Sequence, residues 1–145
     1  MQDQTTLEFI QNQSKEAKYV TSVCTGSLIL AAAGLLQGYK ATCHWAFIDQ
    51  LKMQGVEIVP DRVVVDRDRI TGAGVTSGIE LGLTLLDLLY GEDIAKMTQL
   101  MMEYSPQPPF NSGTLDTAEP QIVESLLQAG KPLIDALRLQ IQSMV

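Results

Sequence analysis

The hydrophobic pattern of the chain alternates between helical periodicity and short apolar runs, which is typical of an α/β protein. Residues 5–17 place apolar side chains on one helical face, and Thr5–Glu8 has the form of a capping box. The short, largely apolar run at residues 19–23 predicts a strand that is covered on both faces. Residues 27–36 are good helix formers, and Gly38 is placed to end that helix.

The alternation continues through the middle of the chain. A short strand at residues 40–45 leads into a helix that Gly55 ends, and residues 56–59 predict a third strand. Two further strands, at residues 62–66 and 69–71, are joined by a charged turn. Strands that are separated by helices in this way predict a sheet with helical connections.

The last third of the chain is mainly helical. Residues 79–90 are apolar nearly all round, which predicts a helix buried on several sides, and Glu92 opens another helix. Residues 105–120 contain four prolines and are expected to be irregular. The tail that follows has apolar residues at helical spacing, and Gly130 and Pro132 are expected to kink or break it.

Composition narrows the class of protein. The sequence has 145 residues, of which 46% are hydrophobic and 19% charged, so we expect one domain over residues 1–145 with a helical tail at 121–145. A formal net charge of −7 argues against nucleic acid as a partner, and no apolar run is long enough for a membrane span. The first residues do not resemble a signal peptide, and two cysteines form no disulfide framework. We therefore expect a cytoplasmic protein, and no cluster of ligands indicates a metal.

Cys24 stands where the strand at residues 19–23 gives way to a helix, which is the position of a nucleophile elbow. Its neighbours at two positions on either side, Ser22 and Gly26, are small, as such a tight turn requires. A thiol at a helix N-terminus is favoured as the thiolate, and the backbone N–H of Thr25 could bind a developing negative charge. The alternative is a small cysteine that only packs. We favour the reactive cysteine, because strand, small neighbours and helix occur together.

His44 lies where the second predicted strand meets its helix. If the strands are parallel, His44 shares the sheet edge of Cys24, and open α/β sheets bind ligands at that edge. There it could orient or polarise a substrate, although a structural histidine bonded to a loop fits the pattern equally well. Cys43 is expected to pack in the core.

Two acidic residues are weaker candidates for chemistry. Glu80, on the apolar helix, is a stronger candidate for a buried hydrogen bond than for proton transfer. Asp66, in a solvated turn, is a poor candidate for a base. The glycine-rich run at residues 72–78 lacks the spacings of phosphate-binding loops. We expect it to allow close approach of the backbone near the active edge.

Four segments resemble the ThiJ/PfpI superfamily. They are VCTGS followed by AAAGLL within residues 23–36, TCHW at 42–45 (with Cys43 where threonine is common), TGAGVTSGIE at 71–80, and EYSPQPPFNSG at 103–113. The last segment is similar to isonitrile (isocyanide) hydratases, in which a proline-rich segment follows the same helix. The likeness extends from about Thr5 to Pro120.

The resemblance implies a flavodoxin-like three-layer α/β/α sandwich, of the class I glutamine amidotransferase-like type, that forms a homodimer and needs no cofactor. It also implies the addition of water to an isocyanide, a small-molecule substrate, to give an N-substituted formamide. Cys24 would attack the terminal carbon and form a thioimidate. Thr25 would help to position the substrate, and Gly26 and His44 would bind it or support the site.

The same resemblance implies that part of the site is missing. In the family, a carboxylate that contacts the cysteine and a Gly-Gly turn come from a β-α-β segment ahead of the helix at residue 5, and neither has a counterpart here. We therefore expect the chain to be an N-terminally truncated version of the fold, its C-terminal two-thirds, with the elbow strand at an unpaired edge. We also expect little or no hydratase activity from these 145 residues.

Two other classes of function are compatible with the elbow. One is a ligand- or stress-sensing domain related to those of bacterial transcription regulators, here without a DNA-binding module. The other is a relative of glyoxalase, chaperone-like or peptidase-like proteins, which should lack the proline-rich segment.

Overall fold

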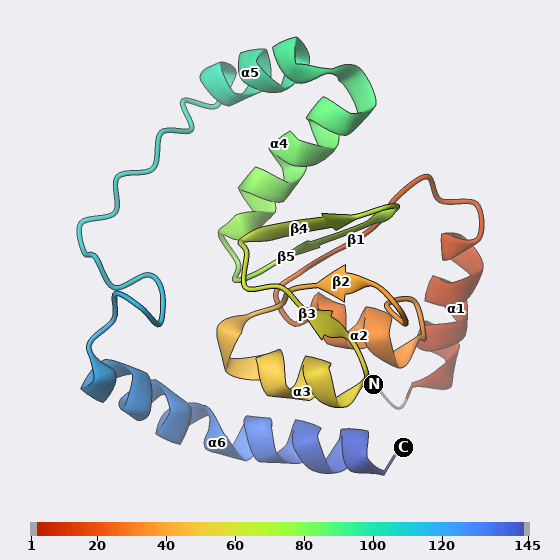
Figure 1. Cartoon of the computed structure of the whole chain (residues 1–145), viewed down its shortest axis with the longest axis vertical. Helices are drawn as coiled ribbons and strands as arrows, with labels where there is room; N and C mark the ends of the chain where they lie inside the picture. The colour runs from red at the N-terminus through yellow and green to blue at the C-terminus, as the bar shows by residue number, and fades with distance from the viewer. Residues whose placement is uncertain (1–2, 144–145) are drawn as a thin grey trace.

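A computed structural model describes residues 3–143, and its centre is a three-stranded sheet with the order β1-β5-β4 (Figure 1). β1 (Val20–Val23) pairs in parallel with β5 (Arg69–Gly72), and β5 pairs antiparallel with β4 (Val63–Asp66). The charged turn at residues 66–69 thus closes the hairpin that the sequence predicts. Within the described residues, β1 lies at an edge of its sheet, as expected for the elbow strand.

A second, smaller sheet pairs β2 (Lys40–Ala41) in parallel with β3 (Glu57–Ile58). β2 is shorter than the strand expected over residues 40–45, because the backbone of the following residue, Thr42, is bonded by side-chain hydroxyls instead of by a neighbouring strand. The chain then forms a short 3-10 helix, η1 (Trp45–Phe47), which continues directly as α3 (Ile48–Met53).

Two helices contact each other beside the larger sheet, α1 (Gln4–Ser14) and α2 (Gly26–Ala32). The N-cap of α1 is Asp3, whose carboxylate accepts the Thr6 N–H at 3.3 Å and the Thr6 hydroxyl at 2.7 Å. The capping box expected at Thr5 is therefore wrong, because an acidic side chain two positions earlier caps the free N–H groups of the first turn.

α2 ends earlier than the predicted helix over residues 27–36. Gly34 adopts a φ of 73°, a left-handed conformation that glycine takes at little cost and that ends a helix. Leu36 follows in the turn and is fully buried. The apolar positions after residue 32 therefore belong to the core, as their hydrophobicity suggests, but not to the helix.

The core lies between the two sheets and the helices α2 and α3. Buried aliphatic side chains from these elements and their connections form one cluster, against which Leu137 of the C-terminal helix also packs. Its buried members are Val20, Leu28, Leu30, Ala31, Leu36, Ala41, Cys43, Leu51 and Val56. Cys43 is thus a core residue, as predicted.

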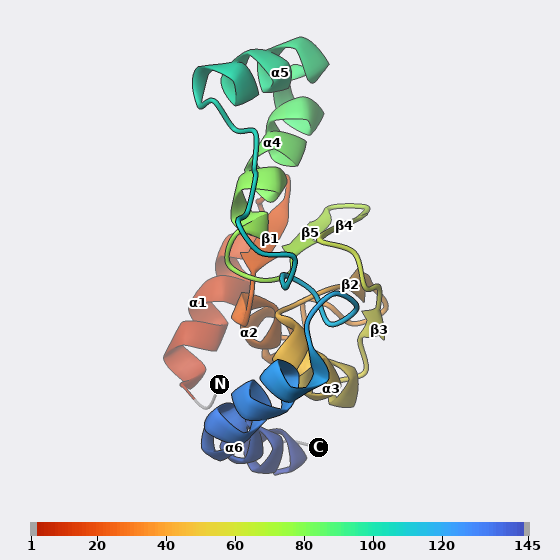
Figure 2. The same ribbon diagram turned by 90° about the vertical axis from the view of Figure 1, so that its left-hand side faces the viewer.

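α4 (Ser77–Tyr90) and α5 (Glu92–Met101) stand away from this core as a helical hairpin (Figure 2). The expectation that α4 is buried on several sides is wrong for this chain. Only Ser77 and Leu81 of α4 are buried, and Leu88 and Tyr90 are 40% and 68% exposed. The apolar pattern indicates that the helix can be buried by other segments, but it does not indicate which segments would bury it.

After α5, the chain follows an irregular path to α6 (Pro120–Gln142), which packs against α3 (Figure 1). α6 continues through Pro132 as one helix that changes direction near its middle, so the tail bends but does not break. Ile141, near its end, is 1% exposed. No helix within residues 3–143 is both long enough and apolar enough to cross a membrane.

Candidate active site at the cysteine elbow

Cys24 occupies a tight turn between β1 and α2. Its φ of 61° is left-handed, which is uncommon for a residue with a side chain and marks a tight, strained turn. Its N–H donates to the carbonyls of Gly72, at 3.0 Å, and Ala73, at 2.7 Å, so the turn is fastened to the end of β5. A Cβ on Gly26 would lie 3.3 Å from that of Ser22, which explains why the flanking residues are small. This is the nucleophile-elbow geometry that the sequence predicts.

The two cysteines have different environments. Cys24 is partly exposed, whereas Cys43 is 1% exposed and its thiol contacts the His44 carbonyl at 3.4 Å. Burial, with a smaller effect of the nearby Cys24, raises the pKa of Cys43 to about 12. Cys43 therefore remains a neutral thiol at physiological pH, and Cys24 is the candidate nucleophile.

Thr25 is the N-cap residue of α2, and its side chain makes no capping hydrogen bond. Its carbonyl accepts the N–H of Leu28 at 3.0 Å, which closes the first turn of the helix immediately after the cysteine. The start of α2 therefore agrees with the prediction that a helix begins directly after Cys24. The Thr25 hydroxyl is consequently not committed to the helix and is available to a ligand.

His44 lies near the elbow, as predicted, but it is not placed there by a strand of the same sheet. β2 belongs to the separate β2-β3 sheet, so His44 does not follow a strand of the Cys24 sheet. Its ring instead lies against the turn after β5, where a Cβ on Gly74 would be 3.7 Å from His44 Cδ2. The Ala46 N–H donates to His44 Nδ1 at 3.3 Å, and burial lowers the pKa of His44. At neutral pH the ring is therefore uncharged, with its proton on Nε2, facing away from that bond.

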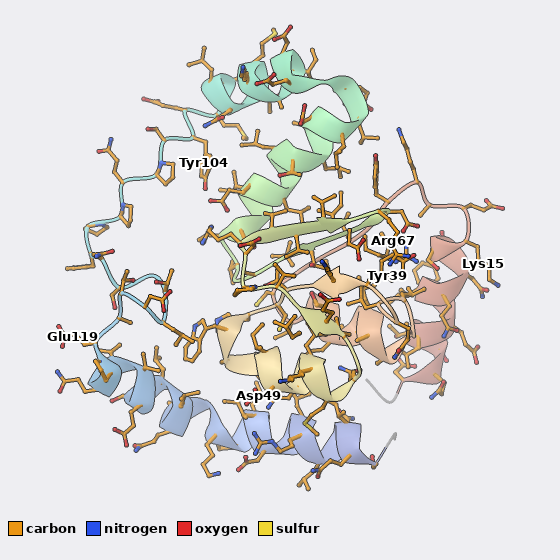
Figure 3. The ribbon with its side chains drawn as sticks, viewed as in Figure 1. Lys15, Tyr39, Asp49, Arg67, Tyr104 and Glu119 are labelled. Carbon is orange, nitrogen blue, oxygen red and sulfur yellow. The ribbon has the colours of Figure 1, made fainter. Side chains whose placement is uncertain are left out.

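Glu80 is committed to an ion pair. It accepts from Arg62 at 2.7 Å and from the Tyr104 hydroxyl at 2.8 Å, and Figure 3 shows Tyr104 in the segment that follows α5. Burial raises the pKa of Glu80, but the hydrogen bonds from Arg62 and Tyr104 together outweigh it and hold the pKa below its ordinary value. The ionised carboxylate is a poor proton donor. Glu80 therefore has the hydrogen-bonding role that the sequence predicts, but its bond with Tyr104 is only partly buried.

Asp66 is likewise occupied by hydrogen bonds and an ion pair within the fold. Its carboxylate accepts the Lys40 N–H at 2.8 Å and pairs with Arg67 at 3.1 Å. Arg67 also stacks over Tyr39, with 3.7 Å between its guanidinium carbon and the ring centre (Figure 3). This cluster connects the hairpin turn to the start of β2. Its hydrogen bonds occupy the Asp66 carboxylate, in agreement with the prediction that Asp66 is a poor candidate for a base.

Four residues near the elbow are joined by hydrogen bonds that the sequence does not indicate. Ser22, Ser27, Thr42 and Thr71 form one hydrogen-bonded chain with distances of 2.7–2.9 Å, and the last three are 0–1% exposed. Serine and threonine at strand ends and helix starts are common, so the sequence carries no sign that these particular residues meet.

A groove lies among α1, β1 and α2. It has a volume of about 400 Å³, and its lining includes Phe9, Tyr19, Ile29, Ser22 and Gly26, but not Cys24 itself. The groove therefore reaches the small residues on either side of the elbow. Among residues 3–143, no group of three or more His, Cys, Asp or Glu side chains is arranged to hold a metal ion.

A parallel strand that leads through a strained cysteine into a helix defines an α/β protein of the cysteine-elbow class. A model of the DJ-1/PfpI family matches residues 1–88, which is more than half of the chain. The chain therefore belongs to the DJ-1/PfpI family, and the predicted α/β sandwich is confirmed.

Relatives of known name and structure agree with this assignment. The chain is 52% identical over 132 residues to an isonitrile hydratase of Pseudomonas putida, a match that covers 91% of this chain and 58% of that protein. A crystal structure of a ThiJ/PfpI family protein from Pseudomonas syringae is 45% identical, with a TM-score of 0.92 over 96% of this chain and 57% of that chain. A transcriptional regulator of Pseudomonas aeruginosa, GbdR, is 31% identical over 66% of this chain and 27% of its own length. The chain thus spans less than two thirds of each of these relatives.

Proposed function

We propose that this chain carries the nucleophile-bearing part of an isonitrile hydratase. The observation that supports this most strongly is the left-handed Cys24 at the elbow, in a chain that is 52% identical to a hydratase over 91% of its length. Such a protein adds water to an isocyanide and releases an N-substituted formamide.

In the proposed reaction, the Cys24 thiolate forms a bond from sulfur to the terminal carbon of the isocyanide, and an acid delivers a proton to the same carbon. The product is a thioimidate, in which a carbon–nitrogen double bond remains. Water then adds to that carbon and the nitrogen takes up a proton. Breaking the carbon–sulfur bond releases the formamide and regenerates the thiol, so the balance is one water added for each isocyanide.

Thr25, Gly26 and His44 support this chemistry in the proposal. Thr25 offers an uncommitted hydroxyl and a backbone N–H beside the sulfur, and Gly26 leaves room at the turn. His44 is neutral and carries its proton on Nε2, so it can donate a hydrogen bond to a bound substrate without competing for the thiol proton.

Neither of the two acidic residues considered above is free to act as the acid. Glu80 is paired with Arg62, and Asp66 is paired with Arg67. We therefore propose that the proton donor lies outside these 145 residues, in the part of the hydratase that this chain does not match.

A second candidate is a ligand-sensing domain, which the similarity to the regulator GbdR favours. That match is 31% identical and covers 98 residues, whereas the match to the hydratase covers 132. A sensor would bind a small molecule at the elbow without turnover, so product formation distinguishes the two proposals.

The test uses cyclohexyl isocyanide as substrate and follows N-cyclohexylformamide by gas chromatography. The 145-residue chain alone is expected to yield no formamide above the buffer background, because the proton donor is absent. A chimera that adds the unmatched part of the Pseudomonas putida hydratase is expected to yield formamide. A folded chimera that makes none would contradict the proposal, and ready turnover by the chain alone would show that a residue within it, such as Glu80, supplies the proton.

A further inference from the structure

The backbone of Thr42 is held by two side-chain hydroxyls instead of by a strand. Thr42 is 1% exposed and lies immediately after β2. Its N–H donates to Thr71 Oγ1 at 2.9 Å, and its carbonyl accepts from Ser27 Oγ at 2.7 Å. A buried peptide group without a partner is costly, so these two hydroxyls complete the hydrogen bonding that the strand no longer supplies.

The direction of these hydrogen bonds is fixed by their chemistry. A carbonyl oxygen only accepts, so the Ser27 hydroxyl points its single proton at Thr42. In the 2.8 Å contact between Ser22 and Ser27, the donor must therefore be Ser22. The result is a directed chain of hydrogen bonds from Ser22, through Ser27, to the carbonyl of Thr42.

The hydroxyls come from the three elements that build the cysteine elbow. Ser22 is on β1, two residues before Cys24, and Ser27 is in the first turn of α2. Thr71 is on β5 and directly precedes Gly72, whose carbonyl accepts the Cys24 N–H at 3.0 Å. Thr42 is consequently tied to the elbow from both sides, at its amide and at its carbonyl.

His44 follows Thr42 by two residues. Its ring is bounded by the Gly74 turn and by the rings of Trp45 and Phe47, at centroid distances of 5.5 and 5.9 Å. Only Cys43 lies between Thr42 and His44, and Cys43 is itself 1% exposed. A displacement of Thr42 would therefore move the ring relative to the elbow.

We propose that Ser27 and Thr71 are positioning residues, which clamp the Thr42 backbone and thereby hold the His44 ring beside the Cys24 elbow. The catalytic relevance of this clamp rests on the proposed function, in which His44 supports the substrate. The clamp itself is a property of the folded chain and can be tested without turnover.

The experiment compares Thr71→Val, which keeps the shape of the side chain and removes the acceptor, with Thr71→Ser, which keeps the hydroxyl. His44 is the one histidine of the 145-residue sequence, so its ring signals in the NMR spectrum of untagged protein are unambiguous. Thr84, half-buried on α4 with its hydroxyl bonded to the Glu80 carbonyl, provides the matched control Thr84→Val.

In the wild type, the His44 ring is expected to titrate below 6.5, because burial lowers its pKa. Thr71→Val is expected to shift the midpoint upward, toward 6.5, as the ring loses its place against Gly74, while Thr71→Ser and Thr84→Val retain the wild-type midpoint. Ser27→Ala, which removes the donor to the Thr42 carbonyl, is expected to shift it in the same direction and replaces Thr71→Val if that variant does not fold.

An unchanged midpoint in folded Thr71→Val or Ser27→Ala would overturn the clamp, whatever the activity. A shifted midpoint in a hydratase-competent chimera that keeps full turnover would uphold the clamp and instead refute the role of His44 in the proposed function. The two failures are therefore distinguishable.

Discussion

Replacing Cys24 by alanine is expected to abolish isocyanide hydration in any form of the protein that turns the substrate over. The loss should be at least about a thousandfold, as for the removal of a covalent nucleophile, because no carbon–sulfur bond can form. The measurement is the initial rate of formamide release, with the variant and its parent prepared and assayed together.

His44→Ala is the informative comparison for that experiment. His44 touches neither the bond that forms nor the bond that breaks in the proposed reaction, so its loss removes one hydrogen bond to the substrate and should slow turnover by only about ten- to a hundredfold. A Cys24→Ala protein as active as its parent would remove the basis of the covalent mechanism. A His44→Ala protein as inactive as Cys24→Ala would give the histidine a more direct part than the one proposed here.

Gly72→Ala is expected to destabilise the folded chain strongly. A Cβ at this position would lie 2.6 Å from Ser77 Oγ and 3.4 Å from Leu81 Cδ1, and Ser77 is fully buried and bonded to the Gly74 carbonyl at 2.7 Å. The hydroxyl cannot move without breaking that bond, so the free energy of unfolding should fall by about 2 kcal/mol, the scale of overpacking in a core. Urea unfolding followed by circular dichroism measures this change.

Gly82→Ala is the matched control for Gly72→Ala. Gly82 lies in the middle of α4, and nothing lies within 4 Å of the Cβ that alanine would add. Alanine should therefore raise the free energy of unfolding by about 0.5–1 kcal/mol, through its higher helix propensity. Equal effects of the two substitutions would contradict the close packing inferred at Gly72.

The features that the sequence predicts well are those with a local cause. The elbow needs a short strand, small neighbours and a helix start, and these stand within a few residues of Cys24. The hairpin around residues 66–69 likewise follows from a charged turn between two apolar runs. The burial of Cys43 agrees with the general tendency of a free cysteine to pack in the core.

The features that were missed depend on contacts between distant residues. α4 is apolar nearly all round, but its exposure in this chain depends on what packs against it, which its own residues do not specify. The early end of α2 at Gly34 reflects a turn that returns Leu36 to the core. The bond between Thr42 and Thr71 joins residues that are 29 positions apart, so no local pattern indicates it.

The central claim is that the fold makes the Cys24 sulfur reactive, and its most direct test is the rate at which iodoacetamide alkylates each cysteine at pH 7. Rates in folded and urea-unfolded protein, each divided by that of free cysteine in the same solution, are obtained from peptide mass spectrometry. We predict that Cys24 reacts faster in the folded chain than in the unfolded chain, while buried Cys43 reacts only after unfolding. Slower alkylation of Cys24 in the folded chain than in the unfolded chain would contradict the claim.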